Sequence, residues 1–63
     1  GFVAHLLNYQ KEPLEDVRVH CPEGSQVRLL ALTPGCDVID KTGVPGEWNI
    51  PKLGVYSVIV VEP

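Results

Sequence analysis

Two histidines and two cysteines are the residues of this 63-residue chain that could bind a metal ion or pair a nucleophile with a base. They are His5, His20, Cys21 and Cys36. Structural zinc sites use closely spaced ligand pairs such as Cys-x2–4-Cys, which are absent here, and the neighbours His20 and Cys21 point to opposite faces of a predicted strand. An activated thiol needs a base within hydrogen-bond reach, and no local signature of a cysteine enzyme surrounds either thiol. We therefore expect no metal site, no catalytic residue and no cofactor in this chain.

The two cysteines could instead form a disulfide, which would contribute about 3 kcal/mol by closing the loop between them. A single cysteine pair is a weak sign of a disulfide framework. We therefore favour two reduced thiols that pack as small hydrophobic side chains. The sequence leaves their redox state open.

Acidic and aromatic residues offer further kinds of site. Paired carboxylates hydrolyse glycosidic bonds only when they face each other across a cleft, and the acids here fall mainly in predicted turns and on outward strand faces. An exposed aromatic ring can stack on a sugar, and Tyr9, at a strand end beside polar residues, is the candidate for a glycan contact. Trp48 and Tyr56 share predicted strand faces with aliphatic residues and are interpreted as core. On that interpretation, Tyr56→Ala should cost about 3–5 kcal/mol of stability.

Charge and hydropathy exclude two classes of partner. The net charge is −3, from five basic and eight acidic residues. Nucleic-acid binders carry a basic stripe, whereas the basic residues here are dispersed along the chain. No apolar run exceeds four residues, far short of the roughly 18 that a membrane helix needs. We expect neither a nucleic-acid partner nor a membrane partner.

The positions of glycine and proline divide the chain into short extended segments. Six glycines and six prolines leave no uninterrupted window long enough for a helix. The pattern predicts six strands: Phe2–Tyr9, Leu14–Cys21, Gln26–Thr33, a short segment at Cys36–Ile39, Glu47–Ile50 ended by Pro51, and Val55–Glu62. The predicted fold class is all-β, a small antiparallel β-sandwich of the immunoglobulin-like or Greek-key type, in one domain spanning residues 1–63.

Three of these predicted strands are apolar on both faces. A simple sandwich strand alternates apolar inward and polar outward positions. The residues assigned to the second face are Val3, Leu7, Leu30, Leu32, Ile59 and Val61. We predict that they form a docking surface for another domain or for a second copy of the chain, because large contiguous apolar patches usually mark contacts. The alternative is that the strands curl or switch sheets, so that both faces meet the core.

Some segments resemble a known kind of domain. The more specific ones are His-Leu-Leu-Asn-Tyr at residues 5–9 and Ile-Pro-x-Leu-x-x-Tyr at residues 50–56. With Pro-Leu-x-Asp-Val-x-Val at 13–19 and Val-x-Leu-Leu-x-Leu-x-Pro at 27–34, their succession resembles the small β-sandwich at the C-terminal end of multidomain glycoside hydrolases with a (β/α)8 catalytic barrel.

The resemblance implies a non-catalytic accessory domain of a carbohydrate-active enzyme, packed in cis against the catalytic domain of a secreted or periplasmic parent. The catalytic acids of that family belong to its barrel, so none is carried over to this chain. The absence of methionine suggests that the chain is a fragment of a larger protein. Two alternatives stay open, a carbohydrate-binding module and an immunoglobulin-like interaction domain of an unrelated surface protein. Self-association of the isolated chain is also an expectation.

Overall fold

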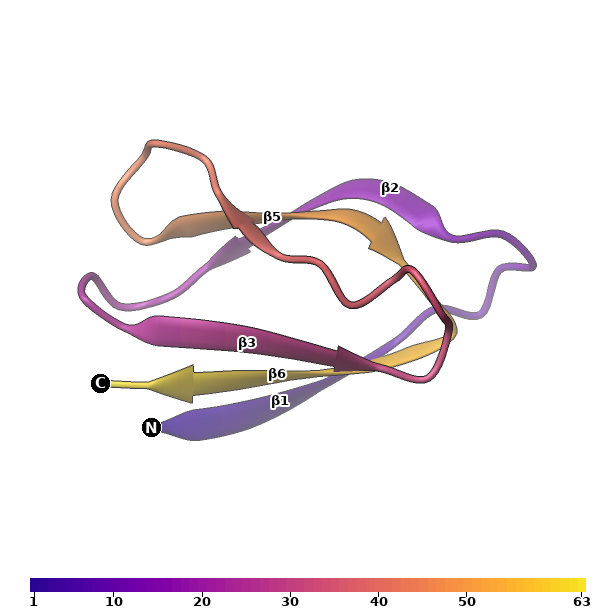
Figure 1. Cartoon of the computed structure of the whole chain (residues 1–63), viewed down its shortest axis with the longest axis horizontal. Helices are drawn as coiled ribbons and strands as arrows, with labels where there is room; N and C mark the ends of the chain where they lie inside the picture. Colours follow the sequence, from indigo (N-terminus) through magenta and orange to yellow (C-terminus); the bar gives the residue numbers. More distant parts are fainter.

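The computed structural model describes all 63 residues, and all of its regular elements are β-strands (Figure 1). The strands are β1 (Phe2–Leu7), β2 (Leu14–His20), β3 (Gln26–Ala31), β4 (Asp40–Lys41), β5 (Glu47–Leu53) and β6 (Tyr56–Glu62). The predictions of an all-β fold and of six strands are confirmed. No helix in the chain could span a membrane.

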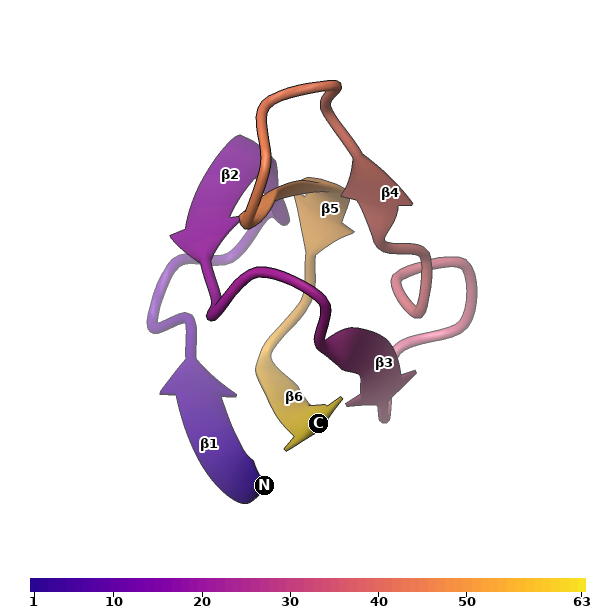
Figure 2. The same cartoon turned by 90° about the vertical axis from the view of Figure 1, so that its left-hand side faces the viewer.

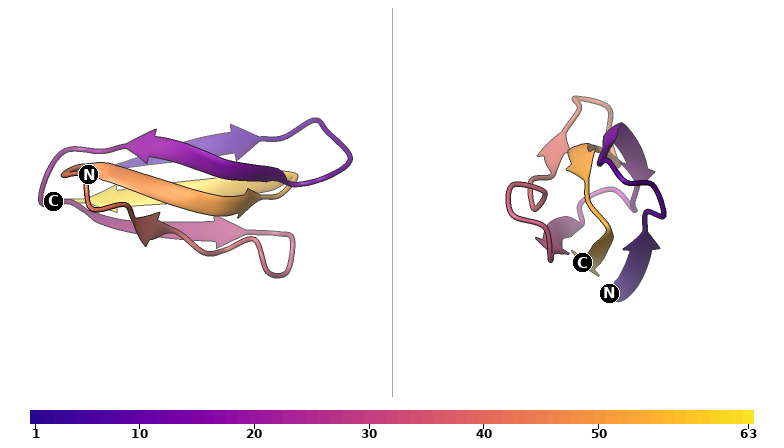
Figure 3. Two further views of the ribbon diagram at one scale, coloured as in Figure 1. Left: turned by 90° about the horizontal axis from the view of Figure 1, so that it is seen from above. Right: turned by 90° about the vertical axis from the view of Figure 1, so that its right-hand side faces the viewer.

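The strands form two three-stranded antiparallel sheets that lie face to face. One sheet has the order β1-β6-β3 and the other the order β2-β5-β4. Figure 2 shows these as two layers, and the right-hand view of Figure 3 agrees. Only β4 and β5 follow each other within one sheet, since every other connection crosses between the layers. This arrangement confirms the predicted antiparallel sandwich.

The core lies between the two sheets and is small. Its fully buried hydrophobic members are Leu29, Ile50, Leu53, Ile59 and Val61, with Leu6, Leu14, Val17, Val19, Cys21, Val27 and Ile39 packed against them. The predicted outward orientation of Ile59 and Val61 is therefore wrong, because they are only 2% and 3% exposed. Ile59 pairs with Ala4 on one side and Leu29 on the other, so all three side chains point into the sandwich. β6 is apolar on both faces, and its period alone could not tell which face is the inner one.

Tyr56 is not part of the core, contrary to its interpretation from the sequence. Along β6 it alternates with the inward-facing Ile59 and Val61, so it shares the outer face with Val58 and Val60. The Tyr56 side chain is half-buried on the outer face of the β1-β6-β3 sheet. Its hydroxyl is hydrogen-bonded to Nδ1 of His5, and the two rings stack with their centroids 5.7 Å apart. Tyr56→Ala would therefore remove a surface contact and leave the core intact, so the expected cost of 3–5 kcal/mol no longer applies.

β5 continues through Pro51, where the sequence predicted its end. The β2–β5 ladder has no bridge between Asp16 and Pro51, so the missing N–H of the proline costs no ladder hydrogen bond. Asp16 adopts a left-handed conformation with φ of 52°, which aspartate tolerates better than most residues. The unpaired Asp16 and Pro51 interrupt the alternation of side chains along β2 and β5. As a result, Ile50 and Leu53 can both face the core although they are three residues apart.

The fourth strand is Asp40–Lys41, whereas the sequence predicted it at Cys36–Ile39. Cys36 is 3% exposed and packs beneath the turn between β5 and β6 instead of pairing in a sheet. A Cβ added at Gly54 in that turn would lie 2.7 Å from Oγ1 of Thr33 and 3.4 Å from Cβ of Cys36. The segment after β3 is thus held by packing against a glycine, which strand periodicity does not reveal.

Both cysteines are free thiols, as the sequence favoured. Cys21 precedes β3 and Cys36 follows it, so a strand of six residues, about 20 Å at ~3.3 Å per residue, runs between them. Disulfide-bonded cysteines have Cα atoms only about 4.4–6.8 Å apart. Burial raises the pKa of the Cys21 thiol, which disfavours the thiolate.

Ser57 is a polar residue within the core, and its replacement should stabilise the chain. It is 0% exposed, lies opposite Leu6 and Ala31, and its hydroxyl oxygen has no hydrogen-bond partner. Ser57→Ala should raise the free energy of unfolding by about 1 kcal/mol, because an unsatisfied buried hydroxyl is removed. The melting temperature of a domain this small should then rise by about 4–8 °C in a thermal scan. A lower melting temperature would mean that the hydroxyl makes a stabilising contact.

Candidate functional site

The outer face of the β1-β6-β3 sheet is apolar over most of its area. Its side chains lie in three rows across the strands: Val3, Val60 and Arg28; His5, Val58 and Leu30; Leu7, Tyr56 and Leu32. Leu32 lies just beyond β3, and its N–H donates to the carbonyl oxygen of Tyr56 at 3.3 Å. We call this set of residues the outer apolar face.

Four aliphatic side chains on the outer apolar face are more than half exposed. The exposed fractions are 54% for Val3, 57% for Leu7, 52% for Leu30 and 77% for Leu32. The predicted docking residues Val3, Leu7, Leu30 and Leu32 thus come together on one surface, whereas the predicted members Ile59 and Val61 belong to the core. In their place β6 contributes Val58 and Val60, half-buried between the flanking strands. The sequence held a signal for this, because charged Glu62 shares the strand face of Val58 and Val60.

Polar groups occupy only two places on this face. His5 and Tyr56 satisfy each other through their hydrogen bond near the centre. Arg28 and Glu62 form an ion pair with 3.3 Å between Nη2 and Oε1 at the end nearest the termini. Both charged side chains are more than half exposed, so the ion pair adds little to stability. The ion pair lies at one end of the face, and the His5–Tyr56 pair separates Leu7 from the other aliphatic side chains.

The outer face of the other sheet has the opposite character. Nε of Arg18 donates to Oδ1 of Asn49 at 2.9 Å. Nη1 of the same arginine lies 3.4 Å from a carboxylate oxygen of Glu47. The second oxygen of Glu47 lies 3.9 Å from Nε2 of His20. Polar residues paired across two strands are typical of a solvated sheet face. The outer face of the β2-β5-β4 sheet is therefore polar, whereas that of the β1-β6-β3 sheet is mostly apolar.

Tyr9, the predicted glycan contact, stands alone in the loop between β1 and β2. Its side chain is 91% exposed, and the small hollow beside it is lined by its neighbours Asn8 and Gln10. Asn8 is 4% exposed and anchors this loop by hydrogen bonds to main-chain atoms. No aromatic side chain lines this hollow, and the glycan contact at Tyr9 stays a prediction.

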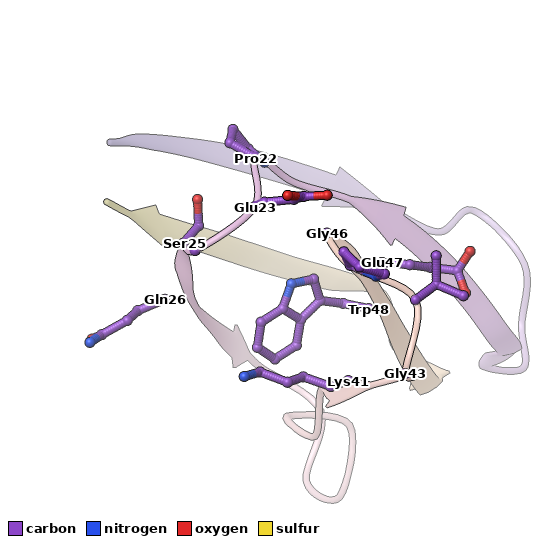
Figure 4. A pocket seen from close by; sticks show the side chains of 12 residues that line it. Pro22, Glu23, Ser25, Gln26, Lys41, Gly43, Gly46, Glu47 and Trp48 are labelled. Atoms are coloured by element: carbon purple, nitrogen blue, oxygen red, sulfur yellow. The ribbon is translucent and has the colours of Figure 1, made fainter.

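A second candidate site surrounds Trp48 at the opposite end of the sandwich. A hollow of about 370 Å³ lies between the β2–β3 turn and the β4–β5 turn (Figure 4). Its polar lining includes Glu23, Ser25, Gln26 and Lys41, and the indole of Trp48 lies among them. The sequence interpreted Trp48 as core. In the structure it is half-buried, because it lies at the open end of the sandwich where two turns flank it.

The residues considered for metal binding and nucleophilic catalysis do not converge. His5 pairs with Tyr56 and His20 with Glu47, and no hydrogen bond joins either histidine to Cys21 or Cys36. No three histidine, cysteine, aspartate or glutamate side chains come together where they could hold a metal ion.

No family model, no curated protein and no solved structure matches this chain. The resemblance to glycoside hydrolases thus rests on the sequence segments named above.

Proposed function

We propose that this chain is a non-catalytic accessory module that packs through its outer apolar face against a neighbouring domain. The observation that carries the proposal is the exposure of Val3, Leu7, Leu30 and Leu32 around Val58 and Val60 on one side of a sheet. Removing apolar surface from water is worth roughly 25 cal/mol per Å². A face of this kind gains most when a second surface covers it.

The layout of the face supports the proposed contact. Stable interfaces have an apolar centre and a polar rim that water still reaches. Here Val58 lies at the centre of the three strands, and the Arg28–Glu62 ion pair lies at one end. The polar outer face of the β2-β5-β4 sheet lacks such a centre, so the contact is assigned to one side of the sandwich.

The neighbour that we propose is the (β/α)8 catalytic barrel of a glycoside hydrolase. The two more specific segments of the resemblance, residues 5–9 and 50–56, meet in space, since Leu7 pairs with Tyr56 and the N–H of Asn8 donates to the carbonyl oxygen of Val55 at 2.9 Å. His5, Leu7 and Tyr56 all lie on the outer apolar face. The resemblance and the proposed contact surface thus share three residues, His5, Leu7 and Tyr56, which supports the proposal.

Hydroxyl-radical footprinting tests the contact by comparing the isolated chain with the full-length product of its reading frame. We expect Leu7, Leu30 and Leu32 to be labelled several-fold more slowly in the full-length protein, and Tyr9 to be labelled equally in both. Leu30→Glu should leave the stability of the isolated chain within about 0.5 kcal/mol, because the side chain is at the surface, and should abolish the protection. Equal labelling of these leucines in both proteins would overturn the proposed contact.

The identity of the neighbour is tested separately. The codons upstream of Gly1 should encode a (β/α)8 barrel, and the isolated chain should not turn over glycosides. A reading frame without a barrel would overturn the assignment to a glycoside hydrolase.

A further inference from the structure

We propose that the hollow around Trp48 binds a neutral saccharide, with the indole ring as a stacking platform. This site lies at the end of the sandwich opposite to Tyr9, and none of its residues belongs to the outer apolar face. The proposal rests on observations of its own and does not depend on the accessory role proposed above.

Main-chain hydrogen bonds hold both walls of the hollow in place. The N–H of Ser25 donates to the carbonyl oxygen of Pro22 at 3.2 Å, which closes the turn after β2. The N–H of Glu47 donates to the carbonyl oxygen of Val44 at 3.0 Å, which closes the turn before β5. The N–H of Cys21 donates to the carbonyl oxygen of Gly46 at 2.7 Å and joins the two turns. The hollow is therefore formed before any ligand arrives, which lowers the entropic cost of binding.

Gly46 shows how closely these two turns approach each other. Its φ of 78° lies in the left-handed region that favours glycine. A Cβ at this position would lie only 2.5 Å from the carbonyl oxygen of Cys21. The approach of the turns, and with it the shape of the hollow, thus depends on a residue without a side chain.

Trp48 is half-buried and lines the hollow. It pairs with Val19 on one side and with Lys41 on the other, and its indole projects into the hollow (Figure 4). The ammonium group of Lys41 lies 5.6 Å from the centre of the indole ring. A sugar ring presents C–H groups on one face and hydroxyl groups around its edge, so it could stack on the indole while its hydroxyls reach polar side chains.

The polar side chains around the indole have no other partners. The carboxylate of Glu23, the hydroxyl of Ser25 and the amide of Gln26 form no hydrogen bond or ion pair within the chain, and the ammonium of Lys41 lies over the indole. They provide acceptors and donors for hydroxyl groups. Glu47 also lines the hollow, but its carboxylate faces Arg18 and His20.

The charges and the size of the hollow favour a neutral polyhydroxyl ligand. Glu23 would repel an anion and Lys41 would repel a cation, whereas hydroxyl groups can hydrogen-bond to both. A purely apolar ligand would desolvate both charges without pairing them, which is costly. The volume of about 370 Å³ lies at the lower end of the ~300–1,000 Å³ usual for small-molecule sites.

The chain contains a single tryptophan, so its fluorescence reports on this site alone. The isolated chain would be titrated up to 10 mM with cellohexaose, xylohexaose, maltohexaose and chitin hexaose, and with tetragalacturonate as the anionic comparison. We expect a saturable change of Trp48 fluorescence with at least one neutral oligosaccharide and none with tetragalacturonate. No response to any neutral oligosaccharide, or an equal response to tetragalacturonate, would overturn the proposal.

Variants then test which residues make the site. Glu23→Ala and Lys41→Ala should each weaken the binding about tenfold, because each removes a hydrogen bond to a charged group. Tyr9→Ser and Leu30→Glu are the matched controls and should leave the dissociation constant unchanged. Circular dichroism would check that every variant is folded. Unchanged binding by both site variants, or loss of binding in Tyr9→Ser, would place the sugar elsewhere and overturn the proposal.

Discussion

Ile50→Ala is expected to unfold a large fraction of the molecules at 25 °C. Ile50 is 0% exposed, lies opposite Val17 in the β2-β5-β4 sheet, and belongs to the core cluster with Leu29 and Ile59 of the other sheet. Truncating a buried isoleucine to alanine costs about 2–5 kcal/mol. A core of this size supplies only about 3–5 kcal/mol in total. Urea denaturation followed by circular dichroism would measure the loss.

Leu30→Ala is the matched control for this prediction. It removes an aliphatic side chain of the same size, but Leu30 is 52% exposed on the outer apolar face. Its cost should be within about 0.5 kcal/mol, as for surface substitutions in general. Equal losses in the two variants would show that burial between the sheets is not what distinguishes these positions. It would also remove the ground for treating the outer apolar face as available to a partner.

The strands were predictable because their signals are local. Proline and glycine mark most of the turns, and the alternation of Val17 and Val19 with charged residues identifies a half-buried strand without reference to the rest of the chain. For the orientation of β6 the only such signal was Glu62 at its end, on the face of Val58 and Val60. When both faces of a strand are apolar, the inner face is decided by the neighbouring strands, here through the pairing of Ile59 with Ala4 and Leu29.

The two candidate sites also differ in how far local sequence signals predicted them. Val3, Leu7, Leu30 and Leu32 were predictable, because Val3 and Leu7 share a strand face with His5, and Leu30 and Leu32 share one with Arg28. The hollow around Trp48 was not, because it arises where two turns distant in sequence are joined by the hydrogen bond between Cys21 and Gly46. No spacing within either turn indicates that contact.

Asn8 was part of the resemblance, and the structure gives it a role in folding. It is 4% exposed, and its Nδ2 donates to the carbonyl oxygens of Glu12 at 3.0 Å and Leu53 at 3.1 Å. Its Oδ1 accepts from the N–H of Gln10 at 2.9 Å. One side chain thus fastens the β1–β2 loop and links it to the end of β5. An asparagine that satisfies three main-chain groups in a buried position is required by the fold whatever the domain binds.

Asn8→Ala is accordingly expected to lower the free energy of unfolding by about 3 kcal/mol, since each buried polar group left unpaired costs about 1–3 kcal/mol and water can reach part of this loop. Urea denaturation would measure the loss, and the amide hydrogen of Gln10 should lose its protection from exchange. Asn49→Ala is the control, because Asn49 bonds only to exposed side chains, and it should cost about 0.5 kcal/mol or less.

Asn8→Asp separates the hydrogen bonds of Asn8 from its packing. The carboxylate can still accept from the N–H of Gln10, but it faces the carbonyl oxygens of Glu12 and Leu53 without a proton to donate. Burial and these oxygens should raise the pKa of the introduced carboxyl above its unfolded value. The folded state then binds the proton more tightly, so the stability of this variant should rise relative to Asn8→Ala as the pH falls through that pKa. A variant as stable as the original chain at pH 7 would show that the hydrogen bonds donated by Asn8 do not hold the loop.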